Sequence, residues 1–394
     1  MKRSHRSMAA LPVTAAVLVA TGLTLASVPT ASQAFAAVRD HAAPSVTVVA
    51  SGLNDPKNVR FGPGGLYIVE SGTGGNSCVS ANGTSLCEGT TGSVALLGRS
   101  GLRTVLPDLP SVSDPSEGTH GPADVTFAGG KLAVLFQDDA LNPDGTTSVQ
   151  GPGSAAFGKL VLASPFAAAW TAGPDVAAFA AAHPQDPATL GGPPGGETVY
   201  DSDPYAIVPY RDGYAIADAA ANDVLWLSPW GKLSIISRLP AVPETVPAGV
   251  FGPDPLTIEG QAVPTSLAVS PEGVLYAGTL PGFPADAGAA RIYRLVPGHA
   301  PVAVASGLTE VSGLAFDNGK LLATEFNTGG GLAPDSTPGA LVEIGAGGNV
   351  TTLPVSGLPE PTGIAVGPDG AVYVAINGNA PPGAGEVVRI TGIG

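Results

Sequence analysis

Basic residues are scarce in this sequence. Lys and Arg together number 17 against 32 Asp and Glu, which gives a formal net charge of −15 at pH 7. A surface with this excess of negative charge repels the phosphates of nucleic acids and anionic lipid headgroups. The composition therefore excludes nucleic acid as a partner, and it suits a cationic ligand as well as an exported protein that only needs solubility.

The motifs of several enzyme classes are also absent. The sequence has no G-x-S-x-G for a nucleophilic serine, no H-E-x-x-H, no P-loop and no Rossmann fingerprint. Its two cysteines, Cys78 and Cys87, lie nine positions apart in a Gly/Ser/Asn-rich segment. This spacing indicates one disulfide that closes a surface loop, because a redox motif needs C-x-x-C and a structural zinc site needs four ligands.

Long apolar runs are missing except near the N-terminus. Three basic residues precede an apolar run from about Met8 to Ala26, and an A-x-A site follows at 34–36. This order is typical of a secretory signal peptide that is removed. We therefore expect cleavage of residues 1–36, a short N-terminal segment at 37–45, and a secreted mature protein with a formal charge of −18 and no transmembrane segment.

Glycine and proline are abundant instead, with 55 and 39 residues, and they punctuate a repeat. Each copy has a Pro or small residue, an apolar strand, a Gly-containing turn and a second apolar strand. The six copies begin at Asp55, Gly121, Asp203, Val263, Glu310 and Glu360. Two later copies place Pro264 and Pro361 97 residues apart with one copy between them, so a repeat is about 48 residues, enough for four short strands.

The repeats predict a closed ring of sheets. A second hairpin follows most copies, and tight Gly turns make consecutive strands antiparallel neighbours, so each unit is a four-stranded meander that needs stacked copies to bury its faces. The last copy ends at GEVVRITGIG without a fourth strand, whereas SVTVVASGL at 45–53 matches the fourth strand of an earlier unit. We therefore predict that residues 46–394 form an all-β, six-bladed β-propeller, closed by the N-terminal strand in the last blade. An open β-solenoid and two β-sandwiches are the alternatives.

Long connections are expected on one face of this ring. The links between units at about 109–121, 171–203 and 239–262 share a face with the loops between second and third strands, and a short helix is expected from Asp175 to about Ala182. Long loops on a rigid scaffold are the usual place for binding or chemistry.

Three acidic residues end second strands at symmetric positions. They are Glu70, Asp218 and Glu325, in the first, third and fifth units. If they converge at the mouth of the central channel, they suit a divalent cation such as Ca²⁺, with Asn377 and Asp138 completing the shell. The alternative is that these carboxylates cap strand ends or pair with basic residues.

Two further candidates come just before first strands on the same face. They are His120 and Asp203, and a histidine beside carboxylates suits a general base, although hydrogen bonding within a loop is the alternative. Glu310 and Glu360 occupy similar positions. The candidate ligand-binding residues on this face are therefore Glu70, His120, Asp203, Asp218, Glu325 and Asn377.

The repeats also carry a family resemblance. The hairpin pattern G-P-D-G-x-h-Y-V resembles NHL and SMP-30/gluconolactonase-type propellers. The segments DSDPYAIVPYRDGYAIADAAANDVLWLSPWG and VPTSLAVSPEGVLYAGTLPGFPADAGAARIYRL are more specifically similar to the ScyD/ScyE family of exported bacterial proteins, over residues 46–390. The resemblance implies export and a six-bladed propeller, and it transfers no catalytic residue. SMP-30-type enzymes hold a divalent metal through acidic and Asn side chains, which the three carboxylates match only loosely.

Two functions stay open at this point. The first is a secreted module that binds an unknown small molecule or an extracellular protein on the long-loop face. The second is a divalent-metal-dependent hydrolase or lyase, similar to a lactonase, with its site at the channel mouth. A redox role with a bound cofactor is a further alternative.

Overall fold

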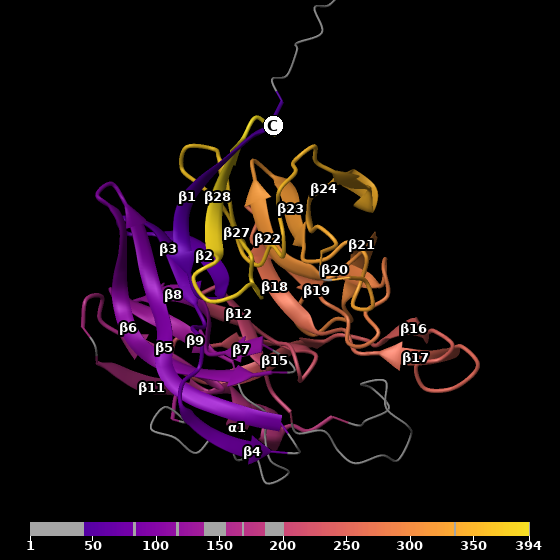
Figure 1. Cartoon of the computed structure of the whole chain (residues 1–394), viewed down its shortest axis with the longest axis horizontal. Helices are drawn as coiled ribbons and strands as arrows, with labels where there is room; N and C mark the ends of the chain where they lie inside the picture. The colour runs from indigo at the N-terminus through magenta and orange to yellow at the C-terminus, as the bar shows by residue number, and fades with distance from the viewer. Residues whose placement is uncertain are drawn as a thin grey trace, which may run out of the picture. The chain divides into compact units, whose positions relative to one another are not determined.

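Six antiparallel sheets succeed one another along the chain in this computed structural model, as a six-bladed β-propeller (Figure 1). The structure describes residues 43–81, 84–115, 118–137, 155–167, 169–185, 201–334 and 336–393. The predicted signal peptide and the candidate ligand Asp138 lie outside the described residues. Within them, no helix has the length and apolar character needed to cross a membrane.

The first three blades each contain a four-stranded meander. Blade 1 has β2 (Pro56–Gly62), β3 (Gly65–Glu70), β5 (Thr84–Gly98) and β6 (Gly101–Asp114), with β4 (Ser77–Ala81) and β7 (Gly118–His120) added to the same sheet. Blade 2 has β8 (Pro122–Ala128), β9 (Lys131–Phe136), β10 (Lys159–Ala163) and β11 (Trp170–Asp175). Blade 3 has β12 (Pro204–Tyr210), β13 (Gly213–Asp218), β14 (Asp223–Leu227) and β15 (Leu233–Arg238).

The last three blades repeat this order. Blade 4 has β18 (Pro264–Val269), β19 (Leu275–Thr279), β20 (Ala290–Leu295) and β21 (Val302–Leu308). Blade 5 has β22 (Val311–Asp317), β23 (Lys320–Glu325), β24 (Ala340–Ile344) and β25 (Val350–Thr352). Blade 6 has β26 (Ile364–Val366), β27 (Val372–Ile376), β28 (Gly385–Thr391) and β1 (Ser45–Leu53).

The N-terminal strand closes the ring, as predicted. β1 pairs antiparallel with β28, from Ser45 opposite Thr391 to Leu53 opposite Gly385. Figure 1 shows the indigo β1 beside the yellow β28. The edge of β28 is thereby paired rather than exposed to other chains.

The hydrophobic core lies between adjacent blades. Alternate residues of each strand face the neighbouring sheet, so Val69 and Val94 of blade 1 pack in one cluster with Val125 and Val134 of blade 2. All four side chains are fully buried. Full burial of such a side chain contributes about 1.5–3 kcal/mol, so repeated inter-blade packing supplies most of the stabilisation.

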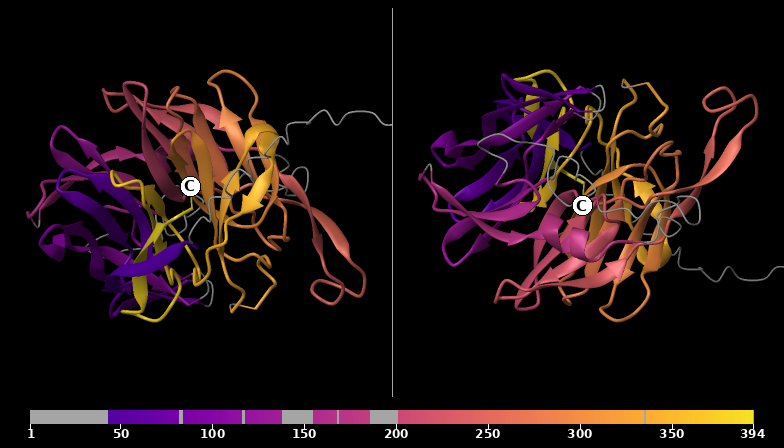
Figure 2. Two further views of the ribbon diagram at one scale, coloured as in Figure 1. Left: turned by 90° about the horizontal axis from the view of Figure 1, so that it is seen from above. Right: turned by 90° about the horizontal axis from the view of Figure 1, so that it is seen from below.

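Two connections expected as loops form strands. Residues 109–121 extend β6 and add β7, while residues 239–262 contain the hairpin β16 (Val242–Val246) and β17 (Leu256–Gly260), which projects from the blades in Figure 2. Strand formation satisfies the backbone groups of these insertions locally. The expected helix is present as α1 (Val176–Ala182), capped where Ala178 N donates to the Asp175 carboxylate at 2.8 Å.

The predicted disulfide is confirmed. Cys78 and Cys87 face each other across the β4–β5 hairpin, with an S–S distance of 2.05 Å. The disulfide therefore joins β4 to the first part of β5, in the segment that follows the second strand of blade 1.

An ion pair between a partly buried arginine and a fully buried aspartate links the first strands of blades 1, 2 and 3. Arg60 Nη2 lies 2.7 Å from Asp124 Oδ2 and donates to the Ile207 carbonyl oxygen at 2.8 Å. Asp124 also accepts from Ile207 N at 2.8 Å and is completely buried. Burial raises the pKa of Asp124 more than Arg60 lowers it, so the carboxylate depends on this cation.

Arg60→Met should leave the Asp124 carboxylate buried without a cation, and such losses cost about 3–5 kcal/mol. Urea denaturation should show this decrease in the free energy of unfolding, and the double variant Arg60→Met/Asp124→Asn should recover at least half of it. Lys320→Met is the control, because it breaks an exposed pair with Glu343 and should cost under about 1 kcal/mol. Equal losses in Arg60→Met and Lys320→Met would contradict the argument.

Candidate functional site

The first strands of neighbouring blades contact one another around the ring, so their starting residues surround the mouth of the central channel. In every blade, a residue just after the second strand donates its N–H to the carbonyl of the residue that precedes the first strand. The pairs are Ser71–Asp55, Gln137–Gly121, Ala219–Asp203, Leu280–Val263, Phe326–Glu310 and Gly378–Glu360, at 2.8–3.2 Å. This recurring bond fixes the chain where it enters each blade.

The bond holds several entering residues in an unusual conformation. The φ angles of Asp55, Val263, Glu310 and Glu360 are 50°, 51°, 46° and 42°. Residues other than glycine seldom adopt this left-handed region, and valine least of all. Such strain persists only where surrounding contacts determine it, and it is common at ligand sites.

The second residue of the first strand forms a β-bulge in five blades. The pairing with the second strand skips Lys57, Ala123, Tyr205, Thr265 and Ser312. A bulge turns a side chain out of the regular alternation of a sheet. Four of these side chains line one cavity at the channel mouth, together with Thr362 at the equivalent place in blade 6.

This cavity, the channel-mouth pocket, has a volume of about 320 Å³ and receives residues from all six blades. Its lining is Lys57, Thr119, His120, Gln137, Asp203, Tyr205, Thr265, Leu280, Glu310, Ser312, Phe326, Thr362 and Asn379. The groups that can carry charge are Lys57, His120, Asp203, Tyr205 and Glu310. The wall is otherwise made of hydroxyls, amides and two apolar side chains.

Three hydroxyls of the wall join successive blades. Thr265 Oγ1 donates to the Val311 carbonyl at 2.7 Å, Ser312 Oγ to the Pro361 carbonyl at 2.5 Å and Thr362 Oγ1 to the Pro56 carbonyl at 2.5 Å. A hydroxyl has one hydrogen and two acceptor lone pairs. Because their hydrogens are used, these three groups offer a ligand only acceptor positions.

Glu310 is the pocket's carboxylate without a partner. Its side chain is in a residue that is 6% exposed, and no hydrogen bond or ion pair from the described part of the chain reaches its carboxylate. Burial raises the pKa of Glu310 to about 7. The group therefore changes charge near neutral pH.

The lysine of the pocket is already engaged. Lys57 Nζ lies 3.0 Å from Asp55 Oδ2, and both side chains are buried. Burial disfavours the charged lysine, but the negative charges of Asp55 and Asp203 outweigh burial and raise the pKa of Lys57. Lys57 is thus a cation committed to Asp55, which leaves Glu310 without one.

The structure places only some of the predicted site residues at this pocket. His120 and Asp203 line it, and both also interact with other residues of the chain. Lys57 and Tyr205 were not selected from the sequence, although they stand directly after the recurring proline. Glu310 was expected on this face, in a position similar to that of His120 and Asp203, but not as a candidate ligand-binding residue. The bulges at Lys57 and Tyr205 were not predicted from the sequence.

The three strand-ending carboxylates hold linkers instead. Glu70 accepts from Asn54 N and Ser93 Oγ, both at 2.8 Å. Asp218 accepts from Asp203 N at 2.7 Å, and Glu325 from Thr309 N at 2.6 Å. Each carboxylate therefore binds the backbone that leads into its own blade.

A shared metal site does not fit these positions. Among the described residues, no three His, Cys, Asp or Glu side chains are grouped so that they could hold a metal ion. Asn377 donates through Nδ2 to the Ala384 carbonyl at 2.9 Å, within its own loop.

Asp218 also interacts with a second buried carboxylate of blade 3, Asp223 at the start of β14. Asp218 and Asp223 are paired across β13 and β14, and burial raises the pKa of Asp218 to about 6 although Ser202, Asp203 and Ala221 donate to it. Burial and the charge of Asp218 raise the pKa of Asp223 well above its ordinary value. The folded protein therefore binds protons that the unfolded chain releases at about pH 4.

Because both pKa values are raised by folding, the free energy of unfolding should fall as pH rises above about 4, through about 6 as Asp218 loses its proton and further as Asp223 loses its own. Asp223→Asn removes one of the two charges, so it should stabilise the protein at pH 8, on the order of 1 to 3 kcal/mol, and reduce the difference between pH 5 and pH 8. Urea denaturation at both pH values measures this, with exposed Asp254→Asn as the control. An unchanged or lower stability of Asp223→Asn at pH 8 would show that the two carboxylates do not repel.

No protein-family model and no curated protein matches the chain. Similar solved structures include a gluconolactonase-like protein (12% identity, 89% of this chain and 93% of that chain covered, TM-score 0.49) and a glucose dehydrogenase (16%, 88% and 98%, 0.48). Virginiamycin B lyase from Staphylococcus aureus is a third (11%, 88% and 99%, 0.46). At this level the likeness concerns the fold alone. With TM-scores below 0.5, these likenesses assign no family to this chain, and the ScyD/ScyE resemblance stays a prediction.

Proposed function

We propose that the protein binds a small hydroxylated molecule carrying a protonated amine, in the channel-mouth pocket. The observation that carries this proposal is the Glu310 carboxylate, which is buried, lines the pocket and has no partner in the described part of the chain. A buried carboxylate is stabilised by a cation and by hydrogen-bond donors. A ligand ammonium supplies both.

The rest of the lining is rich in acceptors. The hydrogens of Thr265, Ser312 and Thr362 are used between blades, so lone pairs remain for the ligand. An ammonium group has three donors and no acceptor. The pocket and an ammonium group are therefore complementary in hydrogen bonding as well as in charge.

The sign of the charge disfavours an anionic ligand. Asp203 and Glu310 line the pocket, and its lysine is neutralised by Asp55 at 3.0 Å. Like charges placed against each other in a buried site cost several kcal/mol. A cationic or neutral ligand meets no such repulsion.

The other lining groups suit hydroxyls on a small ring. The side-chain amides of Gln137 and Asn379 each offer donors and an acceptor, and Leu280 and Phe326 offer apolar contact to the face of a ring. The volume of about 320 Å³ is near the lower end of the roughly 300–1,000 Å³ of ligand pockets. One ring-sized molecule fits it.

Glu310→Gln should weaken binding of 6-amino-6-deoxyglucose at pH 8 by about tenfold or more, because hydrogen bonds to charged groups contribute about 1.5–3 kcal/mol. For the wild type, affinity should fall about tenfold from pH 8 to pH 6, since Glu310 becomes protonated below about pH 7 while the amine stays charged. Isothermal titration calorimetry measures both effects.

Glu272→Gln, at an exposed turn, is the matched control and should bind the amine as the wild type does. Glucose itself should bind more weakly than the amine. Equal affinity of wild type and Glu310→Gln for the amine, or a preference for glucose, would overturn the proposal.

We also propose that the protein acts outside the cytoplasm. The N-terminal pattern of residues 1–36 supports export, and the Cys78–Cys87 disulfide suits an oxidising compartment. When the full chain is expressed in a secreting bacterial host, N-terminal sequencing of protein from the medium should begin after Ala36. Recovery of the intact chain only from the cytoplasm would contradict this.

A further inference from the structure

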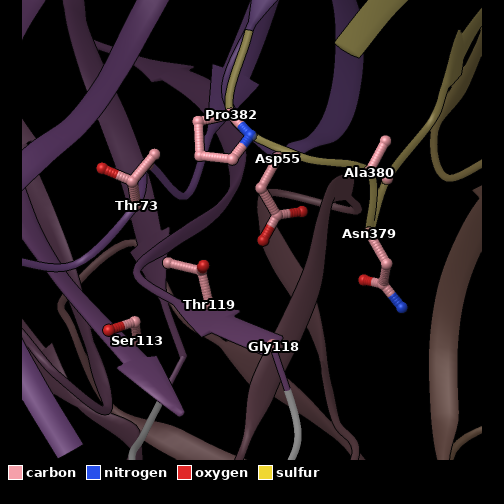
Figure 3. Close-up of a pocket in the computed structure, with 10 residues that line it drawn as sticks. Asp55, Thr73, Ser113, Gly118, Thr119, Asn379, Ala380 and Pro382 are labelled. Carbon is pink, nitrogen blue, oxygen red and sulfur yellow. The ribbon is translucent and has the colours of Figure 1, made fainter. Parts of the chain in front are cut away.

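A second cavity adjoins the channel-mouth pocket at the seam between blades 1 and 6. This seam pocket has a volume of about 230 Å³ and is lined by Asp55, Gly72, Thr73, Ser113, Gly118, Thr119, Gly378, Asn379, Ala380 and Pro382 (Figure 3). Thr119 and Asn379 also line the channel-mouth pocket. The two cavities therefore share a border and form one extended site.

We infer that the seam pocket is a second subsite, which takes a neutral hydroxylated ring linked to the aminated ring at the channel mouth. This inference rests on the proposed function, because the aminated ring is the part of the ligand that Glu310 would bind. The ligand class is then a two-ring, disaccharide-sized amine rather than a single ring.

Unpartnered polar groups indicate a ligand in the seam pocket. Asp55 is 8% exposed, and its Oδ1 has no hydrogen-bond partner within the described residues. The hydroxyls of Thr73 and Thr119 and the side-chain amide of Asn379 likewise make no hydrogen bond with the part of the chain that the structure describes. In Figure 3 the Asp55 carboxylate lies between Thr119 and Asn379. Buried polar groups are normally paired, so the unpaired Asp55 Oδ1 points to an absent partner. Thr73 and Thr119 are partly buried and Asn379 is exposed, so their side chains are available to the same ligand.

The charge of the seam pocket distinguishes it from the channel mouth. The second oxygen of Asp55, Oδ2, lies 3.0 Å from Lys57 Nζ, so the negative charge of this carboxylate is compensated within the protein. Oδ1 then needs a donor but not a second cation. A neutral hydroxyl satisfies it, whereas Glu310 at the mouth has no cation and favours the amine.

The Asp55–Lys57 pair also connects the two subsites. Asp55 lines the seam pocket and Lys57 lines the channel-mouth pocket. The pair therefore forms part of the wall between them, with Thr119 and Asn379 at the opening. A ligand that fills both cavities contacts each end of one ion pair.

Gly72, in the wall of the seam pocket, packs against the backbone of β5. Gly72 has a φ of 92°, and a Cβ at this position would lie 2.6 Å from Gly92 N. A side chain is thus excluded here both by conformation and by space.

The inference is tested by titration calorimetry at pH 8 with three sugars. They are 6-amino-6-deoxyglucose and two (1→4)-linked disaccharides, one with this ring at the reducing end and one with it at the non-reducing end. One disaccharide should bind the wild type at least about tenfold more tightly than the monosaccharide. Thr73→Val keeps the shape and the backbone bond of residue 73, and it should lower that ratio about threefold or more. Ala380→Phe should fill the seam pocket and bring the ratio close to 1, with monosaccharide affinity unchanged in both variants.

Thr351→Val, on an exposed strand of blade 5, is the matched control and should leave both affinities unchanged. A monosaccharide that binds, with neither disaccharide binding more tightly, overturns the seam subsite and leaves the proposed function standing. A disaccharide that binds in a Thr73-dependent way, without monosaccharide binding, supports the seam subsite and overturns the role of Glu310. Failure of all three sugars overturns both.

Discussion

The structure depends on one backbone hydrogen bond that every blade repeats, from a residue after the second strand to the residue before the first strand. This bond ties the inner hairpin of each blade to the segment that enters it from the previous blade. It holds four entering residues at left-handed φ and precedes the bulge that turns side chains toward the channel. Fold and site are therefore not separate parts of this molecule, because the contacts that join the blades also set the lining of the pocket.

In the centre of the ring, two basic side chains are paired within the protein, whereas the Glu310 carboxylate is not. Arg60 and Lys57 are each committed to an aspartate, Asp124 and Asp55, by ion pairs of 2.7 and 3.0 Å. The hydroxyls of Thr265, Ser312 and Thr362 donate their hydrogens to carbonyls of the next blade. The groups that remain for a ligand are the Glu310 carboxylate, the acceptor lone pairs of these hydroxyls, and a few other side-chain amides and hydroxyls of the two pockets. The hydrogens of the first-strand hydroxyls thus join the blades, and their lone pairs are left to accept hydrogen bonds from a ligand.

The sequence predicts the architecture well because local, repeated sequence features determine the fold. Gly-containing turns, alternating apolar strands and an unmatched last copy were enough to predict six blades, the closing role of Ser45–Leu53 and the helix after Asp175. The three acidic residues expected to end second strands, Glu70, Asp218 and Glu325, are the last residues of β3, β13 and β23. The site was harder to predict. Glu70, Asp218 and Glu325 bind linker amides, a role that depends on where the neighbouring backbone places its N–H groups. Glu310, just before the first strand of blade 5, lacks such a donor, and no residue pattern shows a missing contact.

The pairing of β1 with β28 affects how the chain folds during its synthesis. Strands at opposite ends of the polypeptide must meet in one sheet, which makes this the least local contact of the ring. The first strand emerges from the ribosome long before its partner exists, so the circle stays open throughout synthesis. Final closure waits for the last segment of the chain, and a molecule cut short by even one C-terminal strand would leave two sheet edges to aggregate.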